Sequence, residues 1–449
     1  MPPRGVQHDG GLLLGLDVGT TRIKAVVLDA AGGERAAAAV PTPFAVAAGG
    51  VEMDAADFEA ALSSVVAAVG PDRERVAAVG VAGMAESGAP LAAGRPVAPV
   101  IAWYDGRGEE TVAALESRFG PDLARRTGRR VRTVSSVAKL GWLLDHGLAP
   151  PKRWLGVPEL ALFLLTGVEA TEHSLAARTG AYDVIERAWL PSVAAQLGLP
   201  VGIFPAVRRA GSVMGRISEA AARRFGLPAG VPATIAGHDH LAAGAALGTG
   251  DDDLLNSVGT AETVFRRTPT APDVGVALAL DLAVTIWPGG QAWGVLASAA
   301  RSGLVLGGLA ASLGRSPAEL DGLAAAGDAA GGPGSAGARW GAALAGLAAR
   351  TAAAGARVAD LLGPHRRLVV FGGGSRSLPW LAAKAAVAGV PVVRSPVAEA
   401  AVRGAALAAG VAAGWWPSPG DGPVPVLEAP VPDAPVRGGG RPPGTMGGP

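Results

Sequence analysis

The fold of this chain is decided by Gly11-Leu-Leu-Leu-Gly-Leu-Asp17-Val-Gly19-Thr20-Thr21-Arg-Ile-Lys-Ala-Val-Val-Leu28. An apolar run of strand length ends at Asp17, a Gly-Thr-Thr turn follows, and a second apolar run closes the stretch, which predicts a β-hairpin. Gly19 lets the backbone turn tightly beside a ligand, and the hydroxyls of Thr20 and Thr21 can donate to phosphate oxygens. Asp17, at the strand end, is placed to hold a hydrated Mg²⁺ next to that phosphate.

The same pattern returns in the second half of the chain. Val258-Gly259-Thr260 stands between two apolar runs in the stretch 255–265. Glycine, threonine and aspartate are also common in ordinary turns, so one hairpin alone would remain open to that interpretation. The recurrence favours two similar halves, each of which presents a Gly-Thr tip to one ligand held between them.

Length and composition limit the class of protein. At 449 residues the chain suits two large domains with separate apolar cores. Its 39 Lys and Arg nearly balance 38 Asp and Glu, which argues against nucleic-acid and acidic-membrane partners. The absence of cysteine excludes disulfides, thiolate metal sites and thiol catalysis. No apolar run is long enough to span a bilayer and residues 1–11 lack the apolar core of a signal peptide, so we expect a cytoplasmic protein.

Polar residues follow two further strand-like runs. The first run leads into a glycine-bounded loop that carries Glu86, and the second delivers Trp103-Tyr-Asp105-Gly-Arg107. Because sites in α/β proteins gather where strands stop, Glu86, Trp103, Asp105 and Arg107 are candidates for substrate recognition. Asp105 and Arg107 have an equally good alternative interpretation as a local ion pair at a turn.

A predicted strand-to-helix corner carries the candidate general base. A short apolar strand stops at Gly237, Asp239 follows, and a helix of small residues is expected next. Such a corner holds a carboxylate rigidly within reach of substrate, which makes Asp239 a candidate base. Alternatively, Asp239 caps the helix. A metal site at His238 and His240 is disfavoured, because residues two apart diverge from the intervening one and no third ligand is obvious.

Three glycines late in the chain form the last candidate site. A buried-looking strand ends at Phe371 and runs into Gly-Gly373-Gly374-Ser375. Glycines allow a flat ring or a phosphate to approach the backbone closely. We predict that Ser375 is the N-cap of the helix that follows.

The ordered set of motifs resembles the FGGY carbohydrate kinases, and most nearly their xylulokinase-like branch. The resemblance covers about residues 11 to 416 and rests on five segments in this order: Gly15-Leu-Asp17-Val-Gly-Thr20, Trp103-Tyr-Asp105-Gly-Arg107, Gly237-His-Asp239, Val258-Gly-Thr260 and Gly372-Gly-Gly-Ser-Arg-Ser377. It implies an α/β fold of two actin/hexokinase-like (ribonuclease H-like) domains with the active-site cleft between them.

The expected domain organisation has four parts. Residues 1–10 form a flexible leader and residues 11–232 an N-terminal, sugar-binding domain. Residues 233–416 form a C-terminal, nucleotide-binding domain, and residues 417–449 are a disordered tail rich in proline and glycine.

The resemblance implies ATP-dependent transfer of the γ-phosphate to a hydroxyl of a small sugar, polyol or cyclitol. ATP and Mg²⁺ are the implied cofactors, and a homodimer is compatible with the family. The implied roles are Mg²⁺ positioning through water for Asp17, general base for Asp239, contact with ATP for Gly19, Thr20, Thr21, Gly259, Thr260, Gly373, Gly374 and Ser375, and contact with the sugar for Glu86, Trp103, Asp105, Arg107 and Asp239.

Two departures from the family pattern keep other functions open. Ala85-Glu86 stands where xylulokinases have Met-His, and an acceptor-only carboxylate there suits a substrate that offers several hydroxyl donors. A stretch near residues 331–337 is shorter than in the family, which keeps a catalytically inactive sugar or nucleotide sensor as an alternative. An acyl-phosphate kinase is disfavoured, because it would need a cationic acceptor pocket and Glu86 and Asp105 are acidic.

Overall fold

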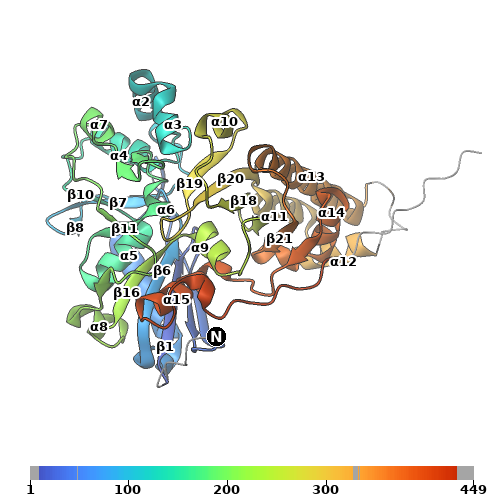
Figure 1. Ribbon diagram of the computed structural model, residues 1–449, viewed down its shortest axis with the longest axis horizontal. Helices are drawn as coiled ribbons and strands as arrows, with labels where there is room; N and C mark the ends of the chain where they lie inside the picture. The colour runs from blue at the N-terminus through green and yellow to red at the C-terminus, as the bar shows by residue number, and fades with distance from the viewer. Residues whose placement is uncertain (1–9, 48, 327–331, 333, 432–449) are drawn as a thin grey trace, which may run out of the picture.

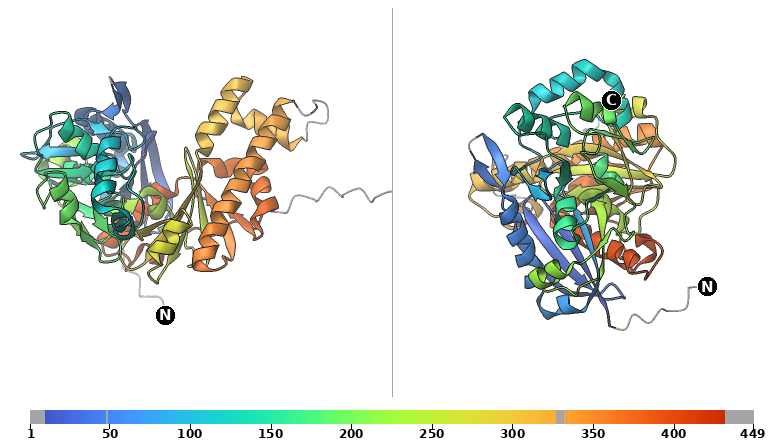
Figure 2. Two further views of the ribbon diagram at one scale, coloured as in Figure 1. Left: turned by 90° about the horizontal axis from the view of Figure 1, so that it is seen from above. Right: turned by 90° about the vertical axis from the view of Figure 1, so that its left-hand side faces the viewer.

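Two six-stranded sheets organise the molecule, and Figure 1 shows them in separate lobes. The structure, a computed structural model, describes residues 10–47, 49–326, 332 and 334–431. In Figure 2 the blue strands of the first sheet and the orange helices that cover the second lie at opposite ends of the molecule. The predicted α/β fold is confirmed, and each sheet contains one of the two predicted hairpins.

The first sheet has the strand order β15-β16-β6-β1-β2-β3. Its strands are β1 (Leu12–Val18), β2 (Arg22–Leu28), β3 (Glu34–Pro41), β6 (Val76–Gly83), β15 (Gly215–Arg216) and β16 (Pro232–His238). β1 is antiparallel to β2 and parallel to β6, and β6 is parallel to β16. Every residue of β1 is buried because helices cover both faces of the sheet. Leu14 packs in the core that contains α1 (Ala55–Ala68) and α5 (Val157–Thr166), while Leu13 faces α15 (Ala400–Ala412).

The second sheet repeats this hairpin in the other lobe. Its order is β19-β20-β18-β17-β21-β22. The strands are β17 (Asp253–Val258), β18 (Glu262–Thr268), β19 (Ala283–Ile286), β20 (Trp293–Ala300), β21 (Arg367–Phe371) and β22 (Val392–Arg394). β17 is antiparallel to β18 and parallel to β21, as β1 is to β2 and β6. The predicted recurrence of the hairpin is therefore confirmed.

Helices and short strands fill the connections. The remaining helices are α2 (Glu109–Phe119), α3 (Pro121–Thr127), α4 (Ser136–Asp145), α6 (His173–Ala176), α7 (Pro191–Gln196), α8 (Glu219–Phe225), α9 (Asp239–Ala245), α10 (Val274–Ala279), α11 (Ser302–Leu313), α12 (Pro317–Ala325), α13 (Ala336–Leu362) and α14 (Leu378–Ala388), with the 3-10 turns η1 (Gly70–Arg75), η2 (Gly373–Arg376) and η3 (Pro419–Asp421). The short strands are β4 (Ala45–Ala47), β5 (Gly50–Met53), β7 (Gly88–Ala92), β8 (Arg95–Pro96), β9 (Val100–Ile101), β10 (Arg153–Gly156), β11 (Ala170–Glu172), β12 (Tyr182–Asp183), β13 (Ala188–Trp189) and β14 (Ala206–Arg208). Within the described ranges, no helix combines the length and apolar character needed to cross a bilayer.

The late helix α15 returns to the first lobe and covers one face of its sheet (Figure 1). The approach is so close that a side-chain carbon on Gly80 would overlap the carbonyl group of Ala405, and one on Gly15 would overlap that of Val402. Only glycine fits at such contacts, because any Cβ would push the helix off the sheet. Lys24 of β2 also pairs with Glu399, just before the helix, at 2.5 Å.

These pairings correct the predicted domain boundary. β16 pairs with β6, so it belongs to the first sheet, although we placed residues from 233 onward in the second domain. The small apolar residues of α15 likewise pack on the first sheet, although that helix lies within the range predicted for the second domain. Sequence order did not reveal this, because the chain crosses between the lobes more than once.

The predicted disordered tail is wrong for residues 417–431. Arg394 of β22 pairs with both carboxylate oxygens of Glu428 at 2.7 and 2.8 Å, and Val431 donates its N–H to Val392. These contacts bind the segment along the edge of the second sheet, where unpaired strand groups are available. Residues 432–449, and residues 1–9 of the predicted leader, lie outside the described residues.

Candidate active site

Three neighbouring parallel strands deliver carboxylates at the same edge of the first sheet. Asp17 is in register with Ala82 of β6, and Ala82 is in register with Gly237 of β16. Glu86 and Asp239 follow the last two of these strands within a few residues. Because side chains at the carboxyl ends of adjacent parallel strands collect at one edge, the candidate Mg²⁺ residue Asp17 and the candidate base Asp239 lie at the same edge of the first sheet, although the sequence placed Asp239 in the second domain.

Asp17 is buried and has one side-chain oxygen without a hydrogen-bond partner among the described residues. That oxygen is Oδ1, and the residue is 5 % exposed. Burial, followed by the charge of Asp239, raises the pKa of Asp17 to about 7, although Lys24 opposes the shift. A desolvated carboxylate with a free oxygen is a suitable hard ligand for Mg²⁺ or for its bound water.

Asp239 is the first residue of α9 and stands at the predicted strand-to-helix corner. Its Oδ1 accepts the backbone N–H of His240 at 2.7 Å and lies 3.2 Å from Nε2 of His238. The N-cap position belongs to His238, which contradicts the alternative that Asp239 is the cap. The Asp239 side chain is 26 % exposed, so it remains accessible to solvent.

The His-Asp-His segment is more compact than its spacing suggested. One ligand atom from each of His238, Asp239 and His240 lies within 4.8 Å of the others, so our geometric objection to a metal site was wrong. The backbone N–H of His238 donates to Ser174 Oγ at 2.9 Å and Nδ1 of His240 lies 3.0 Å from Ser257 Oγ. Burial above all, and then nearby positive charge, holds the pKa of His238 well below its usual value. A neutral His238 with its proton on Nε2 would donate to Asp239.

The two hairpin tips close in the same way. The N–H of Gly19 donates to Arg22 O and the N–H of Gly259 donates to Ala261 O, both at 3.1 Å. These two amides are therefore used inside their turns and are not free for phosphate, so Thr20 and Thr260 are the better candidates for direct contact. The indole N–H of Trp103 donates to the hydroxyl of Thr20 at 2.8 Å.

The triple-glycine corner lies directly on the second hairpin. Gly372 has a φ of 92°, and a Cβ there would stand 2.7 Å from the carbonyl oxygen of Val258. A Cβ on Gly374 would overlap the Val258 side chain, whereas Gly373 faces open space. Ser375 is 2 % exposed and donates to Gly372 O, so our prediction of Ser375 as an N-cap was wrong. Ser377 caps α14 instead, because the intervening residues form the 3-10 turn η2.

Glu86 does not present a free carboxylate. Its Oε1 pairs with Nη1 of Arg129 at 2.8 Å and with Nη2 of Arg178 at 2.5 Å. Burial alone would raise the pKa of Glu86, but the charges of Arg178 and Arg129 outweigh burial and lower it. The backbone has a φ of 71°, a costly conformation for a residue with a side chain, and Ser136 holds its carbonyl at 2.9 Å.

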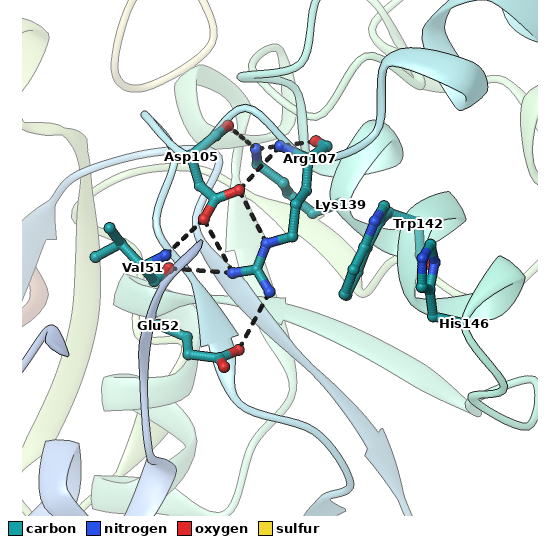
Figure 3. A network of polar contacts seen from close by, with 7 residues as sticks. All are labelled: Val51, Glu52, Asp105, Arg107, Lys139, Trp142 and His146. Atoms are coloured by element: carbon teal, nitrogen blue, oxygen red, sulfur yellow. Dashed lines mark hydrogen bonds and ion pairs between the residues drawn. The ribbon is translucent and has the colours of Figure 1, made fainter. Parts of the chain in front are cut away.

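Asp105 and Arg107 form the ion pair that we weighed as the alternative to sugar binding (Figure 3). Oδ1 of Asp105 accepts the N–H and Nε of Arg107, both at 2.9 Å, and Oδ2 accepts Val51 N–H at 2.6 Å and Nη2 of Arg107 at 3.0 Å. Lys139 donates to the carbonyl of Asp105, and the guanidinium lies over Trp142 at 4.7 Å. With both oxygens occupied, these contacts favour a structural role.

Sequence reasoning missed the partners of the candidate residues. Arg129 and Arg178 reach Glu86 from loops after α3 and α6, and Arg129 is 43 positions away in the chain. Glu172 binds Ser174 twice and also accepts Gly289 N–H, so it fixes the segment that supports His238. No local pattern marks these residues. The single carboxylate of Glu86 in its glycine-bounded loop was the one available signal that a cationic partner should be sought.

The paired sheets, each with a Gly-Thr hairpin and with carboxylates at the strand ends, define a duplicated actin/hexokinase-like fold. The profile of the FGGY family of carbohydrate kinases, N-terminal domain, matches residues 12–248, and that of the C-terminal domain matches residues 333–413. The chain belongs to the FGGY family of carbohydrate kinases.

Individual relatives agree with this assignment. The chain is 31 % identical to the xylulose kinase of Streptomyces coelicolor over 284 residues (60 % of this chain, 57 % of that protein). It is 28 % identical to the L-fuculokinase of Salmonella typhi over 270 residues (57 % and 56 %). The matches span only about half the length of these curated relatives. A solved xyloylose kinase from Brucella ovis superposes with a TM-score of 0.82 over 94 % of this chain and 95 % of that one, at 22 % identity.

Proposed function

We propose that this chain is an ATP-dependent kinase that phosphorylates a hydroxyl of a small sugar, polyol or cyclitol. The observation that carries the proposal is the placement of Asp17 and Asp239 at the ends of β1 and β16, the two strands that flank β6, close enough for the charge of Asp239 to raise the pKa of Asp17. The buried carboxylate of Asp17 suits the binding of a cation, and the partly exposed carboxylate of Asp239 suits the acceptance of a proton. Family membership supports the same reaction class.

Asp239 is the proposed general base. The acceptor hydroxyl gives its proton to Oδ2 of Asp239, which makes no hydrogen bond among the described residues. The hydroxyl oxygen bonds to the γ-phosphorus as the bond from that phosphorus to the bridging oxygen breaks to release ADP. His238 and the N–H of His240 hold Oδ1 and thereby fix the carboxylate. The fixed geometry matters because phosphoryl transfer depends mainly on positioning.

The residues also fit the proposed cofactors. The unpartnered Oδ1 of Asp17 would hold Mg²⁺ or its water, and the metal would neutralise phosphate charge. Thr20 and Thr21 of the first tip and Thr260 of the second are proposed to contact the phosphates through their hydroxyls, while Gly19 and Gly259 shape the two turns. Gly373 leaves open space beside its backbone for the nucleoside, while Gly374 and Ser375 shape the turn.

The test is ADP release from Mg-ATP across ketoses, aldoses, polyols and cyclitols. Asp239→Asn should abolish release but retain nucleotide binding, and Asp145→Asn, which changes an exposed carboxylate of α4, should behave as wild type. Parallel loss of nucleotide binding in Asp239→Asn would mean that Asp239 is structural. Nucleotide binding without turnover of any acceptor would favour the sensor.

A further inference from the structure

Two arginines share one carboxylate oxygen next to the proposed acceptor site. Nη1 of Arg129 and Nη2 of Arg178 both contact Oε1 of Glu86. The side chains of the arginines are only 11 % and 17 % exposed, and that of Glu86 is 5 % exposed. The cluster is therefore largely removed from water, where an uncompensated charge is unfavourable.

The cluster carries a surplus positive charge. Among the described residues, Arg129 and Arg178 have a single carboxylate partner between them, which is Glu86. Besides Arg178 and Glu86, the charge that acts on Arg129 is that of Arg132, which is also positive. Burial, followed by the charge of Arg178, lowers the pKa of Arg129 to about 10, which still leaves it charged at neutral pH. Nε of Arg178 is buried without a hydrogen-bond partner in the described part of the chain, so one donor of the cluster is unsatisfied.

The surplus charge lies close to the segment that holds the proposed base. Arg178 follows α6, and Ser174 of that helix accepts the backbone N–H of His238, the residue before Asp239. The charges of Arg178 and Arg129 both act on His238, in agreement with this proximity. The negative charge of Glu86, which seemed to argue against a cationic acceptor pocket, is more than neutralised by Arg129 and Arg178.

We propose, on the basis of the kinase function above, that the acceptor is a small sugar acid whose carboxylate binds Arg178 and Arg129. Guanidinium groups bind carboxylates by paired, charge-assisted hydrogen bonds, and the free Nε of Arg178 supplies a donor in the right plane. Glu86 holds the two arginines in place before the substrate arrives. A hydroxyl elsewhere on the same molecule would then reach Asp239.

The experiment compares matched acceptors in ADP release from Mg-ATP. Four- to six-carbon aldonates are measured against the aldoses and alditols of the same configuration, and sugar phosphates form a third arm that separates phosphate from carboxylate. We expect kcat/KM for the best aldonate to exceed that of its neutral counterparts at least ~10-fold, as for other buried charge-assisted contacts.

Two variants of the cluster should shift this preference in opposite directions. Arg178→Met should reduce the acid-to-neutral ratio of kcat/KM by roughly 10-fold or more. Glu86→Gln, which removes the internal counter-ion, should raise the ratio. Arg125→Met, a change at an exposed arginine of α3, is the matched control and should leave it unchanged. If Arg178 is merely structural, Arg178→Met should lower turnover of sugar acids and neutral acceptors alike. If Arg178 binds ATP, the variant should raise KM for ATP with either kind of acceptor.

The outcomes separate the inference from the proposed function. Turnover that prefers neutral acceptors or sugar phosphates would overturn the sugar-acid assignment and leave the kinase function intact. If no acceptor releases ADP, the proposed function fails, and thermal stabilisation by aldonates in the presence of Mg-ADP then decides the inference. Stabilisation that Arg178→Met removes would support the carboxylate site, and no stabilisation by any aldonate would overturn it.

Discussion

Trp103 donates its indole N–H to the hydroxyl of Thr20 at 2.8 Å across 83 positions of the chain. The sequence assigned Trp103 to the acceptor and Thr20 to the transferred phosphate, and in the structure the two side chains hold each other. Orientation of the first hairpin tip is thereby coupled to the loop that follows β9.

Trp103→Phe should lower kcat about 5-fold while changing KM for ATP little, because the ring remains but a hydrogen bond worth ~1 kcal/mol is lost. Thr20→Val removes the same bond from the other side. Steady-state kinetics of both single variants and of the double variant form a cycle, in which the double variant should be little worse than the worse single one. Strictly additive losses would mean that the bond does not position Thr20.

Asp17→Asn should stabilise the metal-free protein at pH 8 but not near pH 4. The folded pKa of Asp17 is about 7 and its ordinary value is 3.8, so between these pH values the folded state binds more protons than the unfolded state. Stability therefore falls as pH rises through this window, and removal of the charge should recover roughly 1 to 4 kcal/mol at pH 8.

Urea unfolding at pH 4.5 and pH 8, without Mg²⁺, measures this difference. Glu159 and Glu172, whose pKa values burial also raises to about 7, titrate in both proteins and cancel in the comparison. An equal effect of Asp17→Asn at both pH values would show that Asp17 does not carry a raised pKa. The variant should also lose ADP release, since the proposed Mg²⁺ ligand is gone.

The local patterns of the sequence were sufficient to predict both hairpins, the strand before Asp239 and the helix that begins at this corner. Apolar runs of strand length and a Gly-Thr turn are properties of a few adjacent residues, so they can be read without tertiary information. The placement of Asp17 and Asp239 at one sheet edge was not predicted, because we assigned Asp239 to the second domain. It follows from the pairing of β16 with β6, since the ends of parallel strands share an edge.

Long-range partners could not be predicted in the same way. The free carboxylate that we expected at Glu86 is neutralised by arginines from two distant loops, and the ion pair of Asp105 with Arg107 became distinguishable from a sugar contact only when Val51 was placed beside it. The return of α15 to the first sheet depends on glycines in two other segments. Such contacts are set by packing between elements, which a single sequence does not display.

Gly80→Ala should destabilise the first lobe strongly. A methyl group there would overlap the backbone of Ala405 in α15, and backbone atoms cannot rotate away, so we expect a loss of about 3 kcal/mol. Gly307→Ala is the matched control, because Gly307 lies exposed in α11 with nothing within 4 Å of the added carbon. That change should stabilise by about 0.5 to 1 kcal/mol through helix propensity. Similar denaturation midpoints for the two variants would contradict the close contact of α15 with β6.

Asp105→Asn decides between the two interpretations of the Trp103–Arg107 segment. Burial alone would raise the pKa of Asp105, but the hydrogen bonds from Arg107 and Val51 outweigh burial and lower it, so the carboxylate stabilises the fold above its ordinary pKa and this contribution disappears as the pH falls. An asparagine keeps the shape and loses the charge that neutralises Arg107, which should cost about 2 kcal/mol or more at neutral pH.

If Asp105 is structural, Asp105→Asn should lower the unfolding midpoint while KM for the acceptor changes less than ~2-fold, because its oxygens already have protein partners. If Asp105 binds the sugar, KM for the acceptor should rise at least ~10-fold, as expected for loss of a charge-assisted bond. Thermal unfolding and acceptor kinetics on the same preparation distinguish the two. The four protein hydrogen bonds to the carboxylate lead us to expect the first result, in which the pair braces the loop so that Trp103 can reach Thr20.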